Sequence, residues 1–455
     1  MKNFDLIVVG SGSGLDVASG ASRSGLKVAV VEKDRLGGTC LNRGCIPSKM
    51  LIHRADIIET IQDSEKFGID SEIKNIDFSS IIKEINEEVK MDSESIENGL
   101  KKSDYHTLYK GEAKFVGNRT LEINGKRISG DKIIIAAGSR PKIPPINGIE
   151  EVDYITSKEA LKLEELPEHM IIVGGGYIAA ELGHFYGSMG TEVTIIGRNE
   201  LMIPNEDKDI SQKFTEIFKE KYNVQTGFEV EKVCQKNGEI FVKAVNEKGE
   251  EIETSGDELL IATGRKPNSD LLEVEKANIE TDKGGFIKTN EYLETSVENI
   301  WALGDIAGNW MFKHSANLEA QYIFINAIRD HKHKIDYTAM PHAIFSSPQV
   351  AGVGKTEEEL ESEDREYLKG IYEYEDTGMG MALKEGDGFV KVLVDPENGK
   401  ILGCHIVGPD ASQLIHEVLV SMRAGSGTVQ DIRNTVHIHP ALNEVVQRAF
   451  GSLKR

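Results

Sequence analysis

A pattern that occurs twice constrains the fold of this 455-residue chain more than any other feature. In its first copy, the apolar run 6–9 leads into a Gly-Ser-Gly-Ser-Gly turn at residues 10–14. A helical stretch follows, and a second apolar run at 28–31 ends at Glu32. A strand, a glycine turn, a helix and a strand, with an acid about 20 residues after the glycines, is the pattern of a dinucleotide-binding Rossmann unit.

The second copy begins at the apolar run 170–173 and continues into the glycine triplet 174–176. A helical stretch and the apolar run 193–196 complete it. One such pattern alone is weak evidence, whereas two copies in full context are specific. The sequence therefore predicts an α/β fold with two Rossmann-like dinucleotide-binding domains.

Other parts of the chain show different patterns. Residues 56–100 are acidic and helical and predict two solvated helices, and 133–138 predicts a buried strand whose pattern recurs at 259–265. Residues 141–148 predict an extended linker because of their prolines. From about Tyr337 onward we expect a separate C-terminal α+β domain with antiparallel strands at 343–345, 389–394 and 401–406 and helices at 411–423 and 442–450.

Composition excludes several classes of function. The chain has 75 acidic and 53 basic residues, a formal net charge of -22 that repels a phosphate backbone and argues against a nucleic-acid partner. No apolar run approaches the roughly 20 residues that a membrane helix needs. The first five residues lead directly into a strand pattern and lack the features of a signal peptide, so we expect a cytoplasmic protein.

The first glycine turn has the chemistry of a pyrophosphate site. Backbone N–H groups and a helix N-terminus bind a pyrophosphate, and side chains would block its approach. Gly10, Gly12 and Gly14 meet this requirement, and Glu32 can accept hydrogen bonds from an adenosine ribose. The sixth position of the motif is Leu15 rather than Gly or Ala, a departure that leaves the phosphate contacts in place. The alternative is a glycine-rich turn in an unrelated α/β domain.

The segment 37–49 carries two of the four cysteines, Cys40 and Cys45. Thiols at this spacing can face one another at the start of a helix and close an easily reduced disulfide. Zinc binding is the main alternative, but it needs two more ligands and the sequence has no second paired-cysteine cluster. Cys234 and Cys404 are isolated, and we expect ordinary buried thiols and no metal site.

The segment 37–49 resembles the redox-active motif of the flavoprotein disulfide reductases, the family of dihydrolipoamide dehydrogenase, glutathione reductase, mycothione reductase and mercuric reductase. The resemblance spans essentially the whole chain. It includes the Ala-Thr-Gly-Arg turn at 262–265, the Trp-Ala-Leu-Gly-Asp segment at 301–305 and the His-Pro pair at 439–440.

The resemblance implies a role for each matching residue. Cys40 would attack the substrate disulfide, and Cys45 would lie against the flavin of FAD. Lys49 would lie near flavin N5, paired with Glu181. Asp305 would bind the FAD ribitol.

It also implies a general acid/base and an assembly. His439 would be the general acid/base, oriented by Glu444, because an imidazole titrates near working pH. His437 is the less suitable base, since the catalytic histidine of the family directly precedes the proline. The C-terminal domain would form a homodimer in which each histidine reaches the partner's disulfide, with a small dithiol, disulfide or lipoyl domain as substrate.

The expected domains are an FAD-binding domain at 1–145 and 266–335, an NAD(P)-binding domain at 146–265 and a C-terminal dimerisation domain at 336–455. The residues expected to contact FAD or the nicotinamide nucleotide are, in chain order, Gly10, Gly12, Gly14, Glu32, Gly38, Thr39, Lys49, Ala113, Ala137, Gly138, Gly174, Gly176, Ala179, Arg198, Gly264 and Asp305.

Within the family, residues 40–49 and 341–348 resemble dihydrolipoamide dehydrogenase, which we favour. Residues 10–15, 313–317 and 438–442 resemble mycothione reductase and keep an NADPH-dependent small-thiol disulfide reductase open. Mercuric reductase is disfavoured because no paired cysteines lie near the C-terminus. A flavin-bearing binding protein without turnover is the remaining alternative, and the joint presence of the redox cysteines and the histidine argues against it.

The second strand of the second Rossmann unit bears on nucleotide choice. An NAD-specific unit usually ends this strand with an acid that binds the 2′-hydroxyl, but this chain has Gly197 there and Arg198 next. A guanidinium can bind a 2′-phosphate through charge-assisted hydrogen bonds. Glu200 supplies some opposing repulsion, and we predict that NADPH is preferred or tolerated beside NAD.

Overall fold

The computed structural model describes residues 1–454, which divide into two compact units. The first unit holds residues 1–48, 82–142 and 264–336, and the second holds residues 49–81, 143–263 and 337 onward. The division falls within two helices, α3 (Cys45–Gln62) and α4 (Phe78–Lys101).

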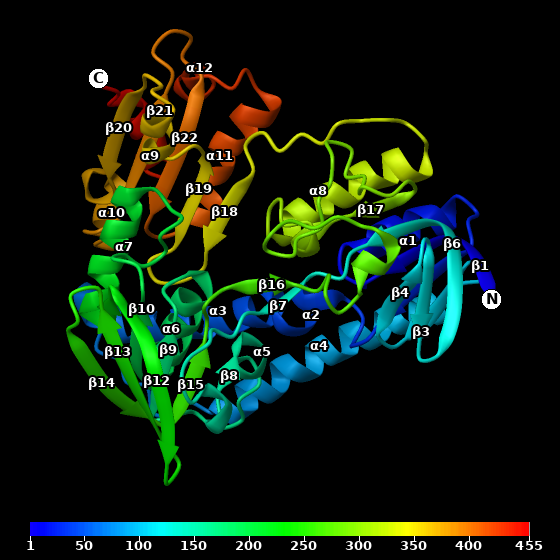
Figure 1. Ribbon diagram of the computed structural model, residues 1–455. Helices are drawn as coiled ribbons and strands as arrows, with labels where there is room; N and C mark the ends of the chain where they lie inside the picture. Colours follow the sequence, from blue (N-terminus) through cyan, green and yellow to red (C-terminus); the bar gives the residue numbers. More distant parts are fainter. Residues whose placement is uncertain (455) are drawn as a thin grey trace. The chain divides into compact units, whose positions relative to one another are not determined.

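A seven-stranded sheet forms the core of the first unit, in the order β3-β2-β1-β6-β5-β4 with β17 paired to β6. Figure 1 labels five of these strands, β1, β3, β4, β6 and β17. Its strands are β1 (Lys2–Val9), β2 (Val28–Glu32), β3 (His106–Lys110), β4 (Ala113–Gly117), β5 (Thr120–Ile123), β6 (Lys126–Ile135) and β17 (Ile300–Ala302). The central strands run parallel, and β4 and β5 extend the sheet antiparallel. Leu6 and Val8 pack in one apolar cluster and Ile7 and Val9 in another, so both faces of β1 are buried, as in a covered parallel sheet.

The predicted first pattern is present as β1, helix α1 (Gly14–Arg23) and β2. The other elements of this unit are helix α2 (Gly38–Arg43), helix α8 (Lys313–Ile323) and the two-stranded ladder of β7 (Ser139–Pro141) and β16 (Arg265–Pro267). The ladder occupies the start of the stretch predicted as a linker, and residues 142–148 then have no strand or helix.

The second unit contains a five-stranded parallel sheet in the order β11-β10-β9-β15-β8. Its strands are β8 (Ile155–Thr156), β9 (His169–Val173), β10 (Glu192–Gly197), β11 (Asn223–Thr226) and β15 (Glu258–Ile261). The helices near it in sequence are α5 (Ser157–Ala160), α6 (Tyr177–Met189) and α7 (Lys208–Lys221). The second predicted pattern is therefore β9-α6-β10.

A three-stranded antiparallel sheet in this unit was absent from the sequence prediction: β12 (Phe228–Lys236), β13 (Glu239–Asn246) and β14 (Glu251–Gly256).

Shorter helical elements along the chain are η1 (Asp63–Phe67), η2 (Ile149–Glu151), η3 (Val274–Ala277), η4 (Gly304–Ile306), η5 (Phe324–Ile328) and η6 (Tyr374–Asp376).

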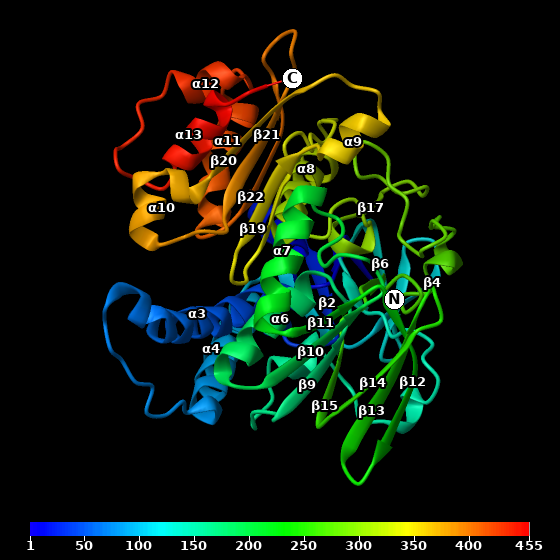
Figure 2. The ribbon, with the colours of Figure 1, turned by 90° about the vertical axis from the view of Figure 1, so that its left-hand side faces the viewer.

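The C-terminal part of the second unit is a five-stranded antiparallel sheet in the order β18-β19-β22-β21-β20. Its strands are β18 (Pro341–Ile344), β19 (Val350–Gly354), β20 (Leu368–Glu373), β21 (Phe389–Val394) and β22 (Ile401–Val407). Helices α11 (Ala411–Ala424), α12 (Val429–Arg433) and α13 (Glu444–Gly451) pack with it in one apolar core, and Figure 2 shows them gathered on one side. Helices α9 (Glu357–Ser362) and α10 (Gly378–Leu383) lie between its strands in sequence.

The predicted α/β fold class with a C-terminal α+β part is confirmed. The two helices expected at 56–100 are α3 and α4, but α3 begins earlier, at Cys45. Within residues 1–454, no helix combines the length and apolar character that crossing a bilayer requires.

Candidate active site

The first glycine turn joins β1 to α1 with very little room for side chains. At Gly10, whose φ is +101°, a Cβ atom would lie 2.2 Å from the carbonyl oxygen of Ala136. At Gly14 it would lie 2.8 Å from Cγ1 of Val8, so helix α1 approaches the strand at this glycine. At Gly12, by contrast, no atom lies within 4 Å of the Cβ position. The turn therefore packs against the protein at Gly10 and Gly14 and has open space at Gly12, where a pyrophosphate such as that of FAD could approach the backbone.

Glu32 is tied to this turn. Its Oε2 accepts hydrogen bonds from the backbone N–H and the hydroxyl of Ser11 at 3.0 and 2.6 Å, and Oε1 accepts from the N–H of Asp34 at 2.8 Å. At Gly38, whose φ is +67°, a Cβ atom would lie 2.7 Å from Cα of Gly12. The carboxylate expected to bind the ribose is therefore oriented by the turn itself, and the start of α2 abuts the same turn.

Asp305 lies in η4, directly after β17. Its Oδ2 accepts a hydrogen bond from the hydroxyl of Ser139 at 2.5 Å and lies 3.4 Å from Nε of Arg265. Arg265 also donates from Nε to Ser139 Oγ at 2.7 Å. The β7–β16 ladder thus holds the carboxylate that was predicted to bind the ribitol of FAD.

Other residues predicted to contact FAD lie in the same unit, between β6 and β7, at the start of β4 and in helix α2. Ala137 accepts a hydrogen bond from the side-chain amide of Asn268 at 2.7 Å, and Gly138 has a φ of +63°. Ala113 begins β4 and pairs with Ile123 of β5. Thr39 lies in helix α2.

The redox segment differs in one respect from the expected helix start. Cys40 lies inside α2 and Cys45 is the first residue of α3, with Gly44 between the two helices. A Cβ atom at Gly44 would lie 2.9 Å from the carbonyl oxygen of Thr39, so only glycine fits this turn. Asn42 holds the segment by donating to the carbonyl oxygens of Leu36 and Gly38 at 2.8 and 3.0 Å. Cys40 is half-buried and Cys45 is exposed.

Lys49 lies one helical turn after Cys45 on α3 and pairs with Glu181 of α6. Nζ of Lys49 is 2.6 Å from both carboxylate oxygens of Glu181 and 4.5 Å from the ring centre of Phe345. The backbone N–H of Phe345 donates to Glu181 at 3.1 Å. The structure therefore brings together the Lys49–Glu181 pair that was predicted, across 132 positions of sequence.

His439 and Glu444 are also brought together. Nδ1 of His439 lies 3.1 Å from each carboxylate oxygen of Glu444, and the imidazole is 76% exposed. The hydrogen bond from His439 holds the pKa of Glu444 below its usual value. His437 differs, because its side chain is only 2% exposed and its Nε2 lies 3.2 Å from Glu417. The more accessible imidazole is therefore that of His439, to which the resemblance assigns the role of general acid/base.

The second glycine turn repeats the first. At Gly174, whose φ is +133°, a Cβ atom would lie 2.3 Å from the carbonyl oxygen of Ala262. Gly176 is the N-cap of α6 and has open space at its Cβ position. Ala179 is buried within α6, Gly264 has a φ of +105°, and Arg198 is exposed directly after the last residue of β10.

Three comparisons bear on this geometry. Residues 4–320 match the family described as pyridine nucleotide-disulphide oxidoreductase, and residues 340–450 match its dimerisation domain. The chain belongs to the pyridine nucleotide-disulphide oxidoreductase family. Mycothione reductase of Mycobacterium tuberculosis is 32% identical over 465 residues, covering 100% of both sequences. Dihydrolipoyl dehydrogenase of Bacillus subtilis is 35% identical over 452 residues, covering 98% of this chain and 95% of the relative.

A solved structure agrees with the sequence relatives. The Cu(II) complex of the HOCl-induced flavoprotein disulfide reductase RclA from Escherichia coli superposes with a TM-score of 0.88 at 27% identity and covers 99% of both chains. This pyridine nucleotide-disulphide oxidoreductase is therefore an FAD-dependent, NAD(P)-linked enzyme that acts on sulfur groups. Its dimerisation domain implies a homodimer.

Sequence reasoning missed polar residues that surround the two turns of this oxidoreductase. Near the first turn, Nζ of Lys313 donates to Ser13 at 2.8 Å and to Asn317 at 2.6 Å. Near the second, Glu206 is buried and pairs with His342 at 2.7 Å. The resemblance at 313–317 pointed to the first group without giving it a role, and no local pattern marked the second.

Proposed function

We propose that the chain moves electrons between a nicotinamide nucleotide and a small dithiol or disulfide through Cys40 and Cys45, with a lipoyl group as the first candidate substrate. The observation that carries the proposal is the glycine turn at Gly44, which joins the helix of Cys40 to the first residue of the helix of Cys45. A helix N-terminus favours the thiolate, which is the reactive form of a cysteine.

The proposed reaction is a thiol–disulfide exchange at Cys40 and Cys45. The Cys40 thiolate attacks one sulfur of a substrate disulfide, and the sulfur that leaves takes a proton from His439. Cys45 then attacks Cys40, which re-forms the Cys40–Cys45 disulfide and releases the second substrate thiolate. FAD, when bound, supplies the relay of two electrons between the nicotinamide and the cysteine pair. Oxidation of a dihydrolipoyl group is the same sequence in reverse.

Lys49, Glu181 and Asp305 have supporting roles in this proposal. The ion pair at 2.6 Å keeps the ammonium of Lys49 in place, and this charge would stabilise negative charge on the flavin of a bound FAD. Asp305, held by its two neighbours, offers carboxylate oxygens to the ribitol hydroxyls. Glu32 would accept hydrogen bonds from the adenosine ribose, and the three glycines of the first turn would receive the pyrophosphate.

His439 is proposed to act on the cysteines of a second subunit. Its imidazole is 76% exposed, and Nδ1 faces Glu444, which leaves Nε2 for the transferred proton. The match of residues 340–450 to a dimerisation domain supports two active sites shared between subunits. The domain division that we propose remains 1–145 with 266–335, 146–265 and 336–455.

A specific observation favours a second candidate, an NADPH-dependent reductase of a small-thiol disulfide. Arg198 is exposed where β10 ends, and the preceding position holds Gly197 rather than an acid. A relative that is a mycothione reductase aligns over the whole chain and supports the same candidate.

A substrate panel with the purified flavoprotein tests both candidates. Dihydrolipoamide with NAD⁺ or NADP⁺ would be compared with oxidised small thiols and NADH or NADPH, and turnover in neither direction would reject the proposal. Arg198→Ala should raise the Michaelis constant for NADPH about tenfold or more and leave that for NADH nearly unchanged, because one charge-assisted contact is lost. Unchanged NADPH kinetics would remove the argument for the second candidate.

A further inference from the structure

The segment between β10 and α7 has one exposed end and one buried end. It begins at Arg198, which is exposed, and ends at Glu206 and Asp207, which are 6% and 0% exposed. Midway, the N–H of Ile203 donates to the carbonyl oxygen of Gly175 at 2.6 Å, so the segment lies against the second glycine turn. In a Rossmann unit, the residues after the second strand recognise the adenosine ribose. The contacts of the buried residues Glu206 and Asp207 therefore help to fix the position of the segment 198–207.

The buried end meets a polar row on the C-terminal sheet. Residues that are paired across four neighbouring strands form this row: His342 of β18, Gly352 of β19, His405 of β22 and Lys391 of β21. Paired residues of neighbouring strands share one face of a sheet, and helix α7 contacts β22. A Cβ atom at Gly352 would lie 2.5 Å from Nε2 of His342 and 3.1 Å from Nδ1 of His405, so glycine makes room for both rings.

Two consecutive acids of the segment bind two different positions of that row, the ammonium of Lys391 and the imidazole of His342. Asp207 lies 2.8 Å from Nζ of Lys391, and Glu206 lies 2.7 Å from Nε2 of His342. The other oxygen of Glu206 accepts a hydrogen bond from the hydroxyl of Tyr177, the first residue of α6 after the glycine turn. The segment is thus bound to the glycine turn on one side and to the C-terminal sheet on the other.

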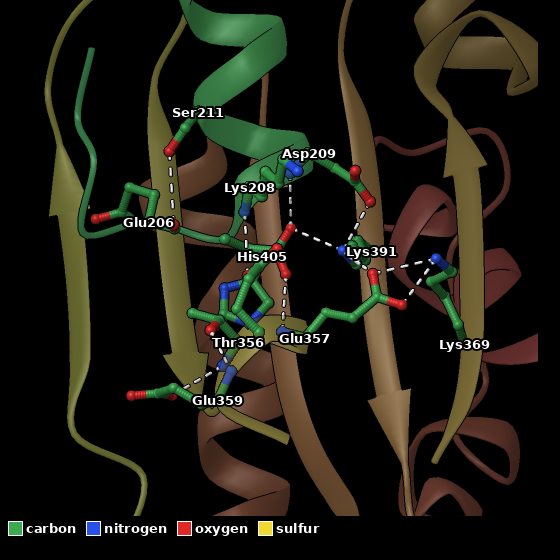
Figure 3. Close-up of polar contacts among 12 residues, drawn as sticks. Glu206, Lys208, Asp209, Ser211, Thr356, Glu357, Glu359, Lys369, Lys391 and His405 are labelled. Atoms are coloured by element: carbon green, nitrogen blue, oxygen red, sulfur yellow. Dashed lines mark hydrogen bonds and ion pairs between the residues drawn. The ribbon is translucent and has the colours of Figure 1, made fainter. Parts of the chain in front are cut away.

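Lys391 is the centre of the ion cluster in Figure 3. Its side chain is 1% exposed, and besides Asp207 it contacts Asp209 at 2.7 Å and Glu357 at 2.5 Å. Burial alone would lower the pKa of Lys391, but the neighbouring carboxylates, Asp207 first, raise it well above its usual value. Lys369 is a second cation on Glu357, at 2.8 Å, and the structure gives it no contact with the segment among residues 1–454.

The cluster holds three carboxylates and two ammonium groups, of which only that of Lys391 is buried. Without Lys391, Glu357 keeps Lys369 and Asp209 is 42% exposed, but the fully buried Asp207 loses its ammonium partner in a poorly solvated place and is repelled by both neighbouring carboxylates. Two of the three lie at the start of α7, which is also where the segment ends. The repulsion would therefore displace the end of the recognition segment, while the parallel sheet behind it stays packed.

We propose that Lys391 and His342 are positioning residues for the nicotinamide nucleotide: from the C-terminal sheet they hold the segment 198–207 in the place where it receives the adenosine end of NAD(P)H. The inference rests on the proposed nucleotide site at this segment. It does not depend on a preference for NADPH, because the anchor holds the segment for either nucleotide.

The test compares Lys391→Met with Lys369→Met in the FAD-loaded enzyme. Both variants remove one ammonium from Glu357, but only the first removes the contact with Asp207. Lys391→Met should raise the dissociation constants of both NADPH and NADH about tenfold, the effect of losing a charge-assisted contact. Lys369→Met should leave both within about twofold, as for an exposed ion pair. Lys391→Arg, which keeps the charge, should restore most of the affinity.

Two further readouts separate positioning from a general loss of structure. The rate at which dithiothreitol reduces the cysteine pair should stay within about twofold in Lys391→Met, because the thiol half-reaction does not use the segment. Hydrogen exchange should increase within residues 198–207 and remain unchanged in strands β9 and β10.

The outcomes decide between this inference and the proposed function. If Arg198→Ala leaves NADPH binding unchanged but Lys391→Met weakens both nucleotides, the NADPH preference fails and the positioning role stands. If Lys391→Met does not fold, His342→Ala replaces it, since alanine removes the hydrogen-bond partner of one oxygen of the buried Glu206, and the affinity of this variant for both nucleotides should fall at least threefold. Nucleotide affinities within twofold of the unmodified enzyme in the folded variants would overturn the proposal.

Discussion

Two glycines of the second glycine turn, where we propose that the nicotinamide nucleotide binds, are expected to respond to alanine in opposite ways. At Gly174, φ is +133° and a Cβ atom would lie 2.3 Å from the carbonyl oxygen of Ala262. At Gly176, φ is −95°, and no atom lies within 4 Å of the Cβ position. The first methyl group would collide with the protein backbone, whereas the second would occupy space that a pyrophosphate needs.

The magnitudes follow from these environments. Gly174→Ala combines a strained backbone with a collision, and we expect the free energy of unfolding to fall by about 2–4 kcal/mol. Gly176→Ala should change it by less than about 1 kcal/mol, because alanine adopts this φ without strain. The same variant should weaken NADPH binding tenfold to a hundredfold, equivalent to losing a hydrogen bond to a charged group worth about 1.5–3 kcal/mol.

Urea denaturation followed by far-ultraviolet circular dichroism gives the stability of both variants, because both tryptophans, Trp301 and Trp310, lie in the first unit whereas the two glycines lie in the second. NADPH titration gives the affinity. The matched pair in the first turn, Gly10→Ala and Gly12→Ala, should behave in the same way towards FAD retention. If Gly176→Ala proves as unstable as Gly174→Ala, or binds NADPH with unchanged affinity, the open space at this glycine is not a phosphate site and the reasoning is wrong.

Three further predictions concern the thiols, the base and a buried carboxylate. Mild reduction should produce a long-wavelength absorption band that is lost in Cys45→Ser and kept in Cys40→Ser, and loss in neither variant would reject the assignment of the sulfurs. His439→Ala should lower turnover about 10²–10⁴-fold while FAD stays bound; mixed dimers with Cys40→Ser should regain one working site, and no activity above the parent dimers would refute the shared site. Burial would raise the pKa of Glu206, but its hydrogen bond with His342 lowers it below 4.5 overall, so its stabilising effect is present above that pH and lost on further acidification. Urea midpoints between pH 3.5 and 7 should therefore fall less steeply in Glu206→Gln than in the unmodified protein, and equal slopes would contradict this.

Much of the fold could be predicted from local sequence patterns. Each predicted Rossmann unit depends on a short apolar run, its glycines and the next strand, all within about 30 residues of one another. The sheet of β12, β13 and β14 was not predicted from the sequence. Buried and exposed residues alternate along its strands, so none of them contains a continuous apolar run. The sequence placed the thiols at the start of a helix and a separate helix from residue 56, and the structure joins these as α3, because a proline within the first turn of a helix costs little.

Contacts between residues that are distant in the sequence could not be predicted from local patterns. The Lys49–Glu181 pair joins residues 132 positions apart, and only the resemblance to a known family anticipated it. Asp207 and Lys391 are 184 positions apart, and neither lies in a motif. A lone lysine in the apolar strand 389–394 was visible in the sequence, but its partners depend on how strands and helices pack, which periodicity does not reveal.

Strand β18 shows why such contacts matter for an enzyme that binds two substrates. His342 reaches Tyr177 at the start of α6 through Glu206, and the backbone of Phe345, just past the strand, donates to Glu181 one turn along the same helix. Residues four apart on a helix share one face, so β18 follows this face of α6 from the nucleotide turn to the carboxylate that holds the redox lysine. Strand β18 is therefore in contact with both positions, whereas Lys391 of β21 contacts the segment before α7 and not Glu181. For this reason the loss of Lys391 is expected to weaken nucleotide binding and to leave the thiol half-reaction unchanged.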